Sequence, residues 1–149
     1  PDSPLVGKPA YDFMLPELGV DGSVKLSSLQ GKYVVLNFWA SWCTSCKTEV
    51  AELEAIHQAY SDSDVVVLGV AIQDRVEDSL RFMKEYRQTF RSVIDDAGEV
   101  AVQYGVIGLP ETFVLDPKGH IIHKTIGPVT AELLKNALRD GGYGAAVTD

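Results

Sequence analysis

Cys43 and Cys46 are the residues of this chain whose type and spacing most clearly indicate chemistry. They are its only two cysteines, and they stand three positions apart between an apolar run and a segment with helical periodicity. Two thiols at this spacing can close a small disulfide ring. A helix that begins at the first thiol favours its thiolate, because unpaired N–H groups and the helix dipole stabilise negative charge. The pair therefore predicts thiol–disulfide exchange.

Half of a metal site and a pair of unreactive thiols are the other interpretations of the two cysteines. A structural zinc site takes four ligands, and the cysteines supply two. The histidines do not suit such a site. His57 lies about 21 Å along a continuous helix from Cys43. The odd separation of His120 and His123 on a strand points them to opposite faces. Copper handling by the two soft sulfurs stays open as an alternative function.

The elements around the cysteines are predicted by the hydrophobic pattern. Residues 33–39 are nearly all apolar, as expected for a strand covered on both faces in a parallel sheet. Apolar residues then recur near helical spacing over residues 43–60, and residues 65–72 predict a second buried strand. The cysteines are thus expected where a buried strand passes into a helix.

The second half of the chain predicts further helices and a terminal hairpin. Asp74 and Glu77 resemble a capping box, and the helix they start would carry Val76, Leu80 and Met83 on one face. The later elements are a short helix opening at 96–99, strands at 111–116 and 120–126 joined by a turn, and a last helix capped by Thr130.

The N-terminal part predicts a small hairpin ahead of the first buried strand. Residues 11–15 and 24–26 flank an Asp21-Gly22 turn, and we expect residues 1–8 to form a flexible tail. No linker divides the chain, so we expect a single domain over residues 1–149. The order of elements predicts an α/β fold with a mixed central sheet flanked by helices and an N-terminal β-hairpin extension.

Composition limits the possible partners. The chain has 149 residues and a net charge of −8, which does not suit nucleic-acid binding. No apolar run approaches the ~20 residues of a membrane-spanning helix. The chain opens on Pro1 without a methionine, so we expect an exported or membrane-anchored protein that lost its signal or anchor. We expect no cofactor, no metal and a monomer.

Two segments resemble the thioredoxin superfamily, and within it the extracytoplasmic thiol–disulfide oxidoreductases of the TlpA/ResA/DsbE group. The first is Phe38-Trp39-Ala40-Ser41-Trp42-Cys43-x-x-Cys46-Lys47, and the second is Tyr104-Gly105-Val106-Ile107-Gly108-Leu109-Pro110-Glu111-Thr112-Phe113. The resemblance implies a thioredoxin-like fold and an enzyme that reduces protein disulfides. It also implies apocytochrome c as the family-typical target, a membrane thiol carrier as electron donor and a periplasmic or outer-surface location.

The resemblance assigns roles to several residues. Cys43, at the helix start, is expected to attack the target disulfide, and Cys46 to resolve the mixed disulfide. Pro110 resembles the family's cis-proline, which would present the backbone of Leu109 to an extended target chain. Trp42 is expected to cover one side of Cys43 as an apolar rim for the partner, or to be a partly buried packing residue.

Asn37 departs from thioredoxins proper, which carry a buried aspartate six residues before the first cysteine. An amide cannot accept the proton of Cys46, so another acid or water is needed. Glu111, beside Pro110, is the first candidate, and an exposed strand acid is its alternative. Asp74 is the second, with helix capping as its alternative. We expect one of these carboxylates to approach the cysteines with a raised pKa.

A peroxiredoxin-like peroxidase and a copper-handling module are the alternatives to disulfide reduction. Peroxiredoxins place a threonine or serine three residues before the reactive cysteine, where this chain has Ala40. Copper-binding relatives use a wider cysteine spacing and a distant histidine, which this sequence does not clearly supply. Both are kept as alternatives to disulfide reduction.

Overall fold

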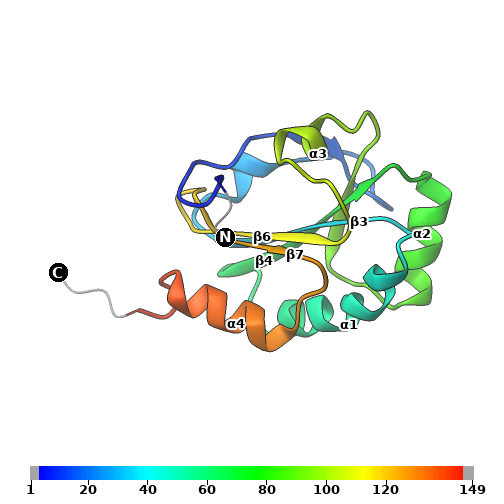
Figure 1. Cartoon of the computed structure of the whole chain (residues 1–149). Helices are drawn as coiled ribbons and strands as arrows, with labels where there is room; N and C mark the ends of the chain where they lie inside the picture. The colour runs from blue at the N-terminus through cyan, green and yellow to red at the C-terminus, as the bar shows by residue number, and fades with distance from the viewer. Residues whose placement is uncertain (1–3, 146–149) are drawn as a thin grey trace.

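The computed structural model describes residues 4–145 and is built around a five-stranded sheet (Figure 1). Its strands are β3 (Tyr33–Trp39), β4 (Val65–Ile72), β5 (Arg91–Asp95), β6 (Glu111–Leu115) and β7 (Ile121–Ile126). They lie in the order β5-β4-β3-β6-β7. The first three are mutually parallel, whereas β6 and β7 pair antiparallel with their neighbours. The predicted thioredoxin-like mixed sheet is confirmed.

Helices cover both faces of this sheet. They are α1 (Thr44–Ala59), α2 (Val76–Glu85), α3 (Glu99–Gln103) and α4 (Ala131–Asp140). Figure 1 shows α1 and α4 together on one face and α3 on the other. Leu53 of α1 and Leu134 of α4 share an apolar core with Val35 on the first face. Tyr104 and Phe113 belong to the core of the second face.

The alternation of side chains along β3 decides which residues can meet α1. Val35 and Trp39 belong to the core on the α1 face, and Phe38 belongs to the core on the α3 face. Asn37, between Phe38 and Leu36, therefore faces α1. In β6, Thr112 is paired with Asn37 and Glu111 with Phe38. Directly paired residues share a face, so Glu111 faces α3 and points away from α1.

The predicted N-terminal hairpin is present. Its strands β1 (Met14–Pro16) and β2 (Ser23–Lys25) pair antiparallel, and the 3-10 helix η1 (Leu26–Leu29) follows. The prediction of a flexible tail through residue 8 is wrong for Gly7 and Lys8. The Gly7 N–H donates to Ile121 at 2.7 Å, and the Lys8 carbonyl accepts from Ile121 at 2.9 Å. Residues 1–3 of the predicted tail lie outside the described residues.

The short strand β5 was not predicted from the sequence. It has only Val93 and Ile94 as apolar residues, between charged ends, so it shows neither alternation nor an apolar run. The polar side chains of Ser92 and Asp95 are buried because each has a hydrogen-bond partner, whereas Arg91 is exposed. Ser92 Oγ accepts from Trp39 Nε1 at 3.1 Å, and Asp95 Oδ2 accepts from the Ala101 N–H at 2.9 Å. Hydrogen bonds to residues outside the strand thus allow β5 to be buried, although its sequence has no strand-like hydrophobic pattern.

The predicted capping box of α2 is wrong, and of its predicted apolar face only Met83 packs against the core. The N-cap residue is Arg75, without a side-chain capping bond, and the buried residues of the helix are Ser79 and Phe82. Val76 and Leu80 are exposed. Phe82 packs on Trp39 with ring centroids 4.9 Å apart. The Phe82–Trp39 contact and the buried Ser79 thus determine which face of α2 packs against the sheet. A pattern of apolar residues alone does not predict that a serine lies on the buried face.

Candidate active site

Cys43 and Cys46 lie where β3 has ended and α1 begins. Cys43 is the N-cap of α1, and its Sγ accepts from the Cys46 N–H at 3.2 Å. The two sulfurs form a disulfide, with Cα atoms 5.3 Å apart. Cys43 is 5% exposed and Cys46 1%. The predicted ranking of exposure is confirmed, although in the disulfide state both residues are buried.

The predicted cis peptide bond between Leu109 and Pro110 is present. Pro110 is buried and directly precedes β6, which pairs with β3 through Glu111 and Phe38. The bond therefore lies at the end of the sheet where β3 leads to the cysteines. Leu109 packs against the apolar core that contains Cys43 and Cys46. Direct packing of Pro110 beside Cys43 stays a prediction.

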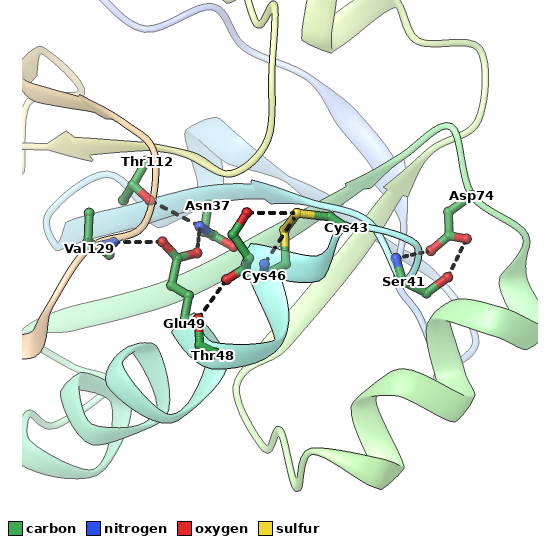
Figure 2. Close-up of a disulfide and its surroundings, with 10 residues drawn as sticks. Asn37, Ser41, Cys43, Cys46, Thr48, Glu49, Asp74, Thr112 and Val129 are labelled. Atoms are coloured by element: carbon green, nitrogen blue, oxygen red, sulfur yellow. Dashed lines mark hydrogen bonds between the residues drawn. A yellow bond between two sulfur atoms is a disulfide. The ribbon is translucent and has the colours of Figure 1, made fainter.

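Asp74 binds the loop before the cysteines rather than the cysteines themselves. Its carboxylate accepts from the Ser41 N–H at 2.8 Å, from Ser41 Oγ at 2.7 Å and from Ser79 Oγ at 2.8 Å. It also accepts from the Arg75 N–H at 3.0 Å. These bonds occupy both oxygens, so the expectation that Asp74 acts on the thiols is not supported. Its geometry instead fixes the β3–α1 loop to the start of α2 (Figure 2).

Glu111 is fully buried, but on the far side of the sheet from α1. Its Oε2 accepts from the N–H groups of Ile107 at 3.0 Å and Gly108 at 3.2 Å. Its Oε1 lies 3.4 Å from Lys124 Nζ. The expectation that this carboxylate approaches the cysteines is wrong, because the strand register turns it toward α3. Proximity to Pro110 in sequence does not carry over to the side chain.

The acid beside the cysteines is Glu49, which the sequence analysis missed. It lies three residues after Cys46 on the inner face of α1, a spacing at which helical side chains are neighbours. Glu49 Oε1 accepts from Asn37 Nδ2 at 2.8 Å, and Oε2 accepts from the Val129 N–H at 2.9 Å. Asn37 Nδ2 also donates to Thr112 Oγ1 at 3.0 Å. Figure 2 shows this network next to the disulfide.

Burial sets the proton affinity of Glu49. Glu49 is only 2% exposed. Loss of water disfavours the carboxylate and raises the pKa of Glu49 from 4.5 to about 7, against the opposing effect of the bonds from Val129 and Asn37. A carboxyl group with this pKa exchanges protons readily at neutral pH.

A signal for Glu49 was present in the sequence. Within α1 the buried positions are Cys46, Glu49, Val50, Leu53 and Ile56. A glutamate in such an apolar stripe is rarely buried without a partner. Asn37, which cannot accept a proton, faces it from β3. The acid is thus located on α1 rather than on β3, and the Asn37 amide of β3 is its hydrogen-bond donor.

Comparison with known proteins assigns this arrangement to a family. The AhpC/TSA family matches residues 6–124. The chain belongs to this family. It is 37% identical over 133 residues to the thiol:disulfide interchange protein DsbE of Allochromatium vinosum, covering 88% of this chain and 72% of that protein. It is 36% identical over 138 residues to the thiol-disulfide oxidoreductase ResA of Oceanobacillus iheyensis, covering 91% and 72%.

Solved structures agree with the sequence relatives. A putative DsbE from Chlorobium tepidum has a TM-score of 0.83 at 29% identity and covers 91% of this chain and 96% of its own. StoA from Bacillus subtilis has a TM-score of 0.73 at 32% identity, with 90% and 98% covered. This member of the AhpC/TSA family is therefore a thiol–disulfide oxidoreductase of the DsbE/ResA type, and Cys43–Cys46 is its CxxC pair.

In this AhpC/TSA-family member Trp42, next to Cys43 in sequence, is largely exposed. Trp42 is 55% exposed, and its Nε1 donates to the Gln73 carbonyl at 2.8 Å, which holds the ring beside the cysteine loop.

Among residues 4–145 there is no group of three or more side chains suited to a metal ion. The copper alternative stays an untested prediction. Within the same residues, none of the helices has the length and apolarity to cross a membrane.

Proposed function

We propose that this protein is an extracytoplasmic reductase of protein disulfides that uses the Cys43–Cys46 dithiol. The observation that carries the proposal is the cysteine pair at the N-terminus of α1 with the buried carboxyl group of Glu49 one turn further along. The helix start favours a thiolate at Cys43. Glu49, with a pKa of about 7, supplies a proton acceptor close to Cys46.

Two exchange steps transfer the electrons. The Cys43 thiolate attacks one sulfur of the target disulfide, the target S–S bond breaks, and a mixed disulfide forms while one target sulfur leaves as thiolate. Cys46 then gives its proton to Glu49 and attacks Cys43 Sγ. The mixed disulfide breaks, the second target sulfur leaves and takes up a proton, and Cys43–Cys46 is left oxidised. The target gains two electrons and the enzyme loses them.

Asn37 and Thr112 position the proton acceptor in this scheme. The two N–H bonds of the Asn37 amide go to Glu49 Oε1 and Thr112 Oγ1, which fixes the amide between β3 and β6. Both partners of the Glu49 carboxylate are donors, so they hold its oxygens in place when it is ionised. Trp42 and Leu109 flank the cysteines as contact points for the target chain.

The partners follow from the resemblance to the TlpA/ResA/DsbE group. We expect apocytochrome c as the target and a membrane thiol carrier as the donor that reduces the Cys43–Cys46 disulfide again. An exported or membrane-anchored protein fits both partners. The names of the DsbE and ResA relatives support disulfide exchange in general terms.

Trapping of mixed disulfides tests the order of the two steps. In Cys46→Ser the serine cannot attack, so this variant should accumulate a mixed disulfide with a disulfide-containing peptide, whereas Cys43→Ser should accumulate none. Non-reducing electrophoresis and mass spectrometry detect the adduct. Equal trapping by both variants would contradict the ordered mechanism.

A second measurement addresses Glu49. Glu49→Gln removes the proton acceptor and should slow reductase turnover about 100-fold, within the range of general acid–base catalysis. Glu52→Gln is the matched control on α1, because Glu52 accepts from the N–H of Ala131, the first residue of α4, at 2.9 Å, next to the Val129 segment that Glu49 binds. Unchanged turnover in Glu49→Gln would leave water as the acceptor.

A further inference from the structure

The carboxylate of Glu111 is buried and has no part in the exchange steps, yet it is bound to the segment that precedes Pro110. Its Oε2 accepts two main-chain N–H groups, from Ile107 and Gly108. A single oxygen that holds two successive amides fixes the path of the chain between them. Leu109, whose backbone is expected to meet the target, is the next residue.

Lys124 is the partner of the other oxygen. Its Nζ lies 3.4 Å from Glu111 Oε1, which has no hydrogen bond within the described residues. Lys124 stands opposite Phe113 in the β6–β7 pairing, and its Nζ lies 5.2 Å from the centre of the Phe113 ring. The side chain is 13% exposed, so both charges are largely removed from water. Removal of one leaves the other buried and unpaired, which is strongly unfavourable.

The segment held in this way displays an apolar side chain to solvent. Ile107 is 89% exposed, although its main chain is tied to a fully buried carboxylate. Glu111 itself is fixed between Phe38 of β3 and Ile126 of β7. The segment 107–109 is therefore anchored to the first residue of β6, a strand that is paired on both sides.

We propose that Glu111, paired with Lys124, is a positioning residue for protein substrates: it fixes segment 107–109 so that Ile107 and the Leu109 backbone meet the target chain next to Cys43. The proposal rests on the disulfide exchange proposed above. Thiol–disulfide exchange requires the three sulfurs to align, so a displaced target chain reacts less often. A small disulfide that does not use the segment does not depend on the ion pair.

The test compares Glu111→Gln, Lys124→Met and the double variant with wild type. The control is Glu99→Gln, an exposed glutamate of α3. The substrates are a peptide with an intramolecular Cys-X-X-Cys disulfide and oxidised glutathione. We expect both single variants to raise KM for the peptide about five-fold or more, with the rate toward glutathione unchanged. Hydrogen exchange at the Ile107 and Gly108 amides should accelerate about ten-fold in both.

The double variant keeps the proposal testable if a lone buried charge unfolds one of the single variants. It removes both charges, so it should fold and still show the raised KM. A parallel fall of both substrate rates with a shifted pH profile would assign Glu111 a chemical role instead. Faster exchange with unchanged KM, or unchanged exchange, would also overturn the proposal. Failure of the wild type to reduce the peptide would refute the proposed function alone, because the exchange measurement tests the ion pair separately.

Discussion

Glu49 combines two opposing influences on one side chain. Burial raises its pKa to about 7, while the Val129 N–H and the Asn37 amide stabilise the ionised form. Below pH 4.5 this carboxyl group is protonated in both the folded and the unfolded chain. Between pH 4.5 and 7 the folded chain binds the proton more tightly. Stability contributed by this site is therefore lost as the pH rises through that interval.

This difference predicts a pH dependence of stability. From pH 4.5 to pH 7 the contribution of Glu49 to the free energy of unfolding should fall by about 3 kcal/mol, and Glu49→Gln should remove that part of the slope. Urea unfolding of the oxidised protein at a series of pH values measures it. Glu132→Gln, an exposed residue of α4, serves as control and should keep the slope. Parallel curves for wild type and Glu49→Gln would contradict the prediction.

The accessibility of the two thiols gives a further test at this scale. Cys43 is at the helix start and is more exposed than Cys46. In the reduced protein at neutral pH, iodoacetamide should therefore alkylate Cys43 first, since the thiolate is the nucleophile. Peptide mapping by mass spectrometry identifies the labelled residue. Faster labelling of Cys46 would exchange the assigned roles.

At the scale of the elements, Asp74 joins the β3–α1 loop to α2. It receives bonds from Ser41 and Ser79, so one carboxylate holds two elements and the cysteines that follow. Ser79 is completely buried. The geometry of the β3–α1 loop thus depends on Asp74, which lies 33 residues after Ser41 in the chain.

Removal of this link should be costly. Asp74→Ala leaves the buried Ser79 hydroxyl and the Ser41 N–H without their acceptor, so the free energy of unfolding should fall by about 2 kcal/mol. Asp78→Ala on α2 is the control. Its ion pair with Arg81, at 3.1 Å, is exposed and should contribute less than about 1 kcal/mol. Chemical denaturation compares the two, and equal losses would contradict the assigned role of Asp74.

The whole molecule places the cysteines at one end of a sheet with a core on each face. In the disulfide state both cysteine residues are buried. A buried site disfavours a thiolate, and a strong oxidant is one whose reduced form is stabilised. The start of α1 acts in the opposite direction, because it favours the Cys43 thiolate. The proposed electron flow toward the target disulfide requires that the effect of burial outweigh that of the helix start.

We accordingly expect a reduction potential closer to the ~−270 mV of thioredoxin than to the ~−120 mV of a strong oxidant. Equilibration of the Cys43–Cys46 pair with dithiothreitol or glutathione buffers measures the potential. A value near the oxidising limit would reverse the direction of electron flow in the proposed function.

The sequence by itself determined the parts of this protein that depend on neighbouring residues. The cysteine pair, the strand before it, the helix after it and the cis bond at Pro110 were all predicted, because each depends on a local pattern or a recognisable motif. The order of these elements was sufficient for the mixed sheet, although β5 was missed for want of apolar residues.

The tertiary structure alone decided which acid accompanies the thiols. Glu111 was expected there because it follows Pro110, but one step along a strand reverses the face of the sheet. Glu49 was overlooked because its partners, Asn37 and Val129, lie 12 and 80 residues away in the chain. Contacts over such distances arise from packing, and burial, which sets the pKa of Glu49, is a property of the folded chain.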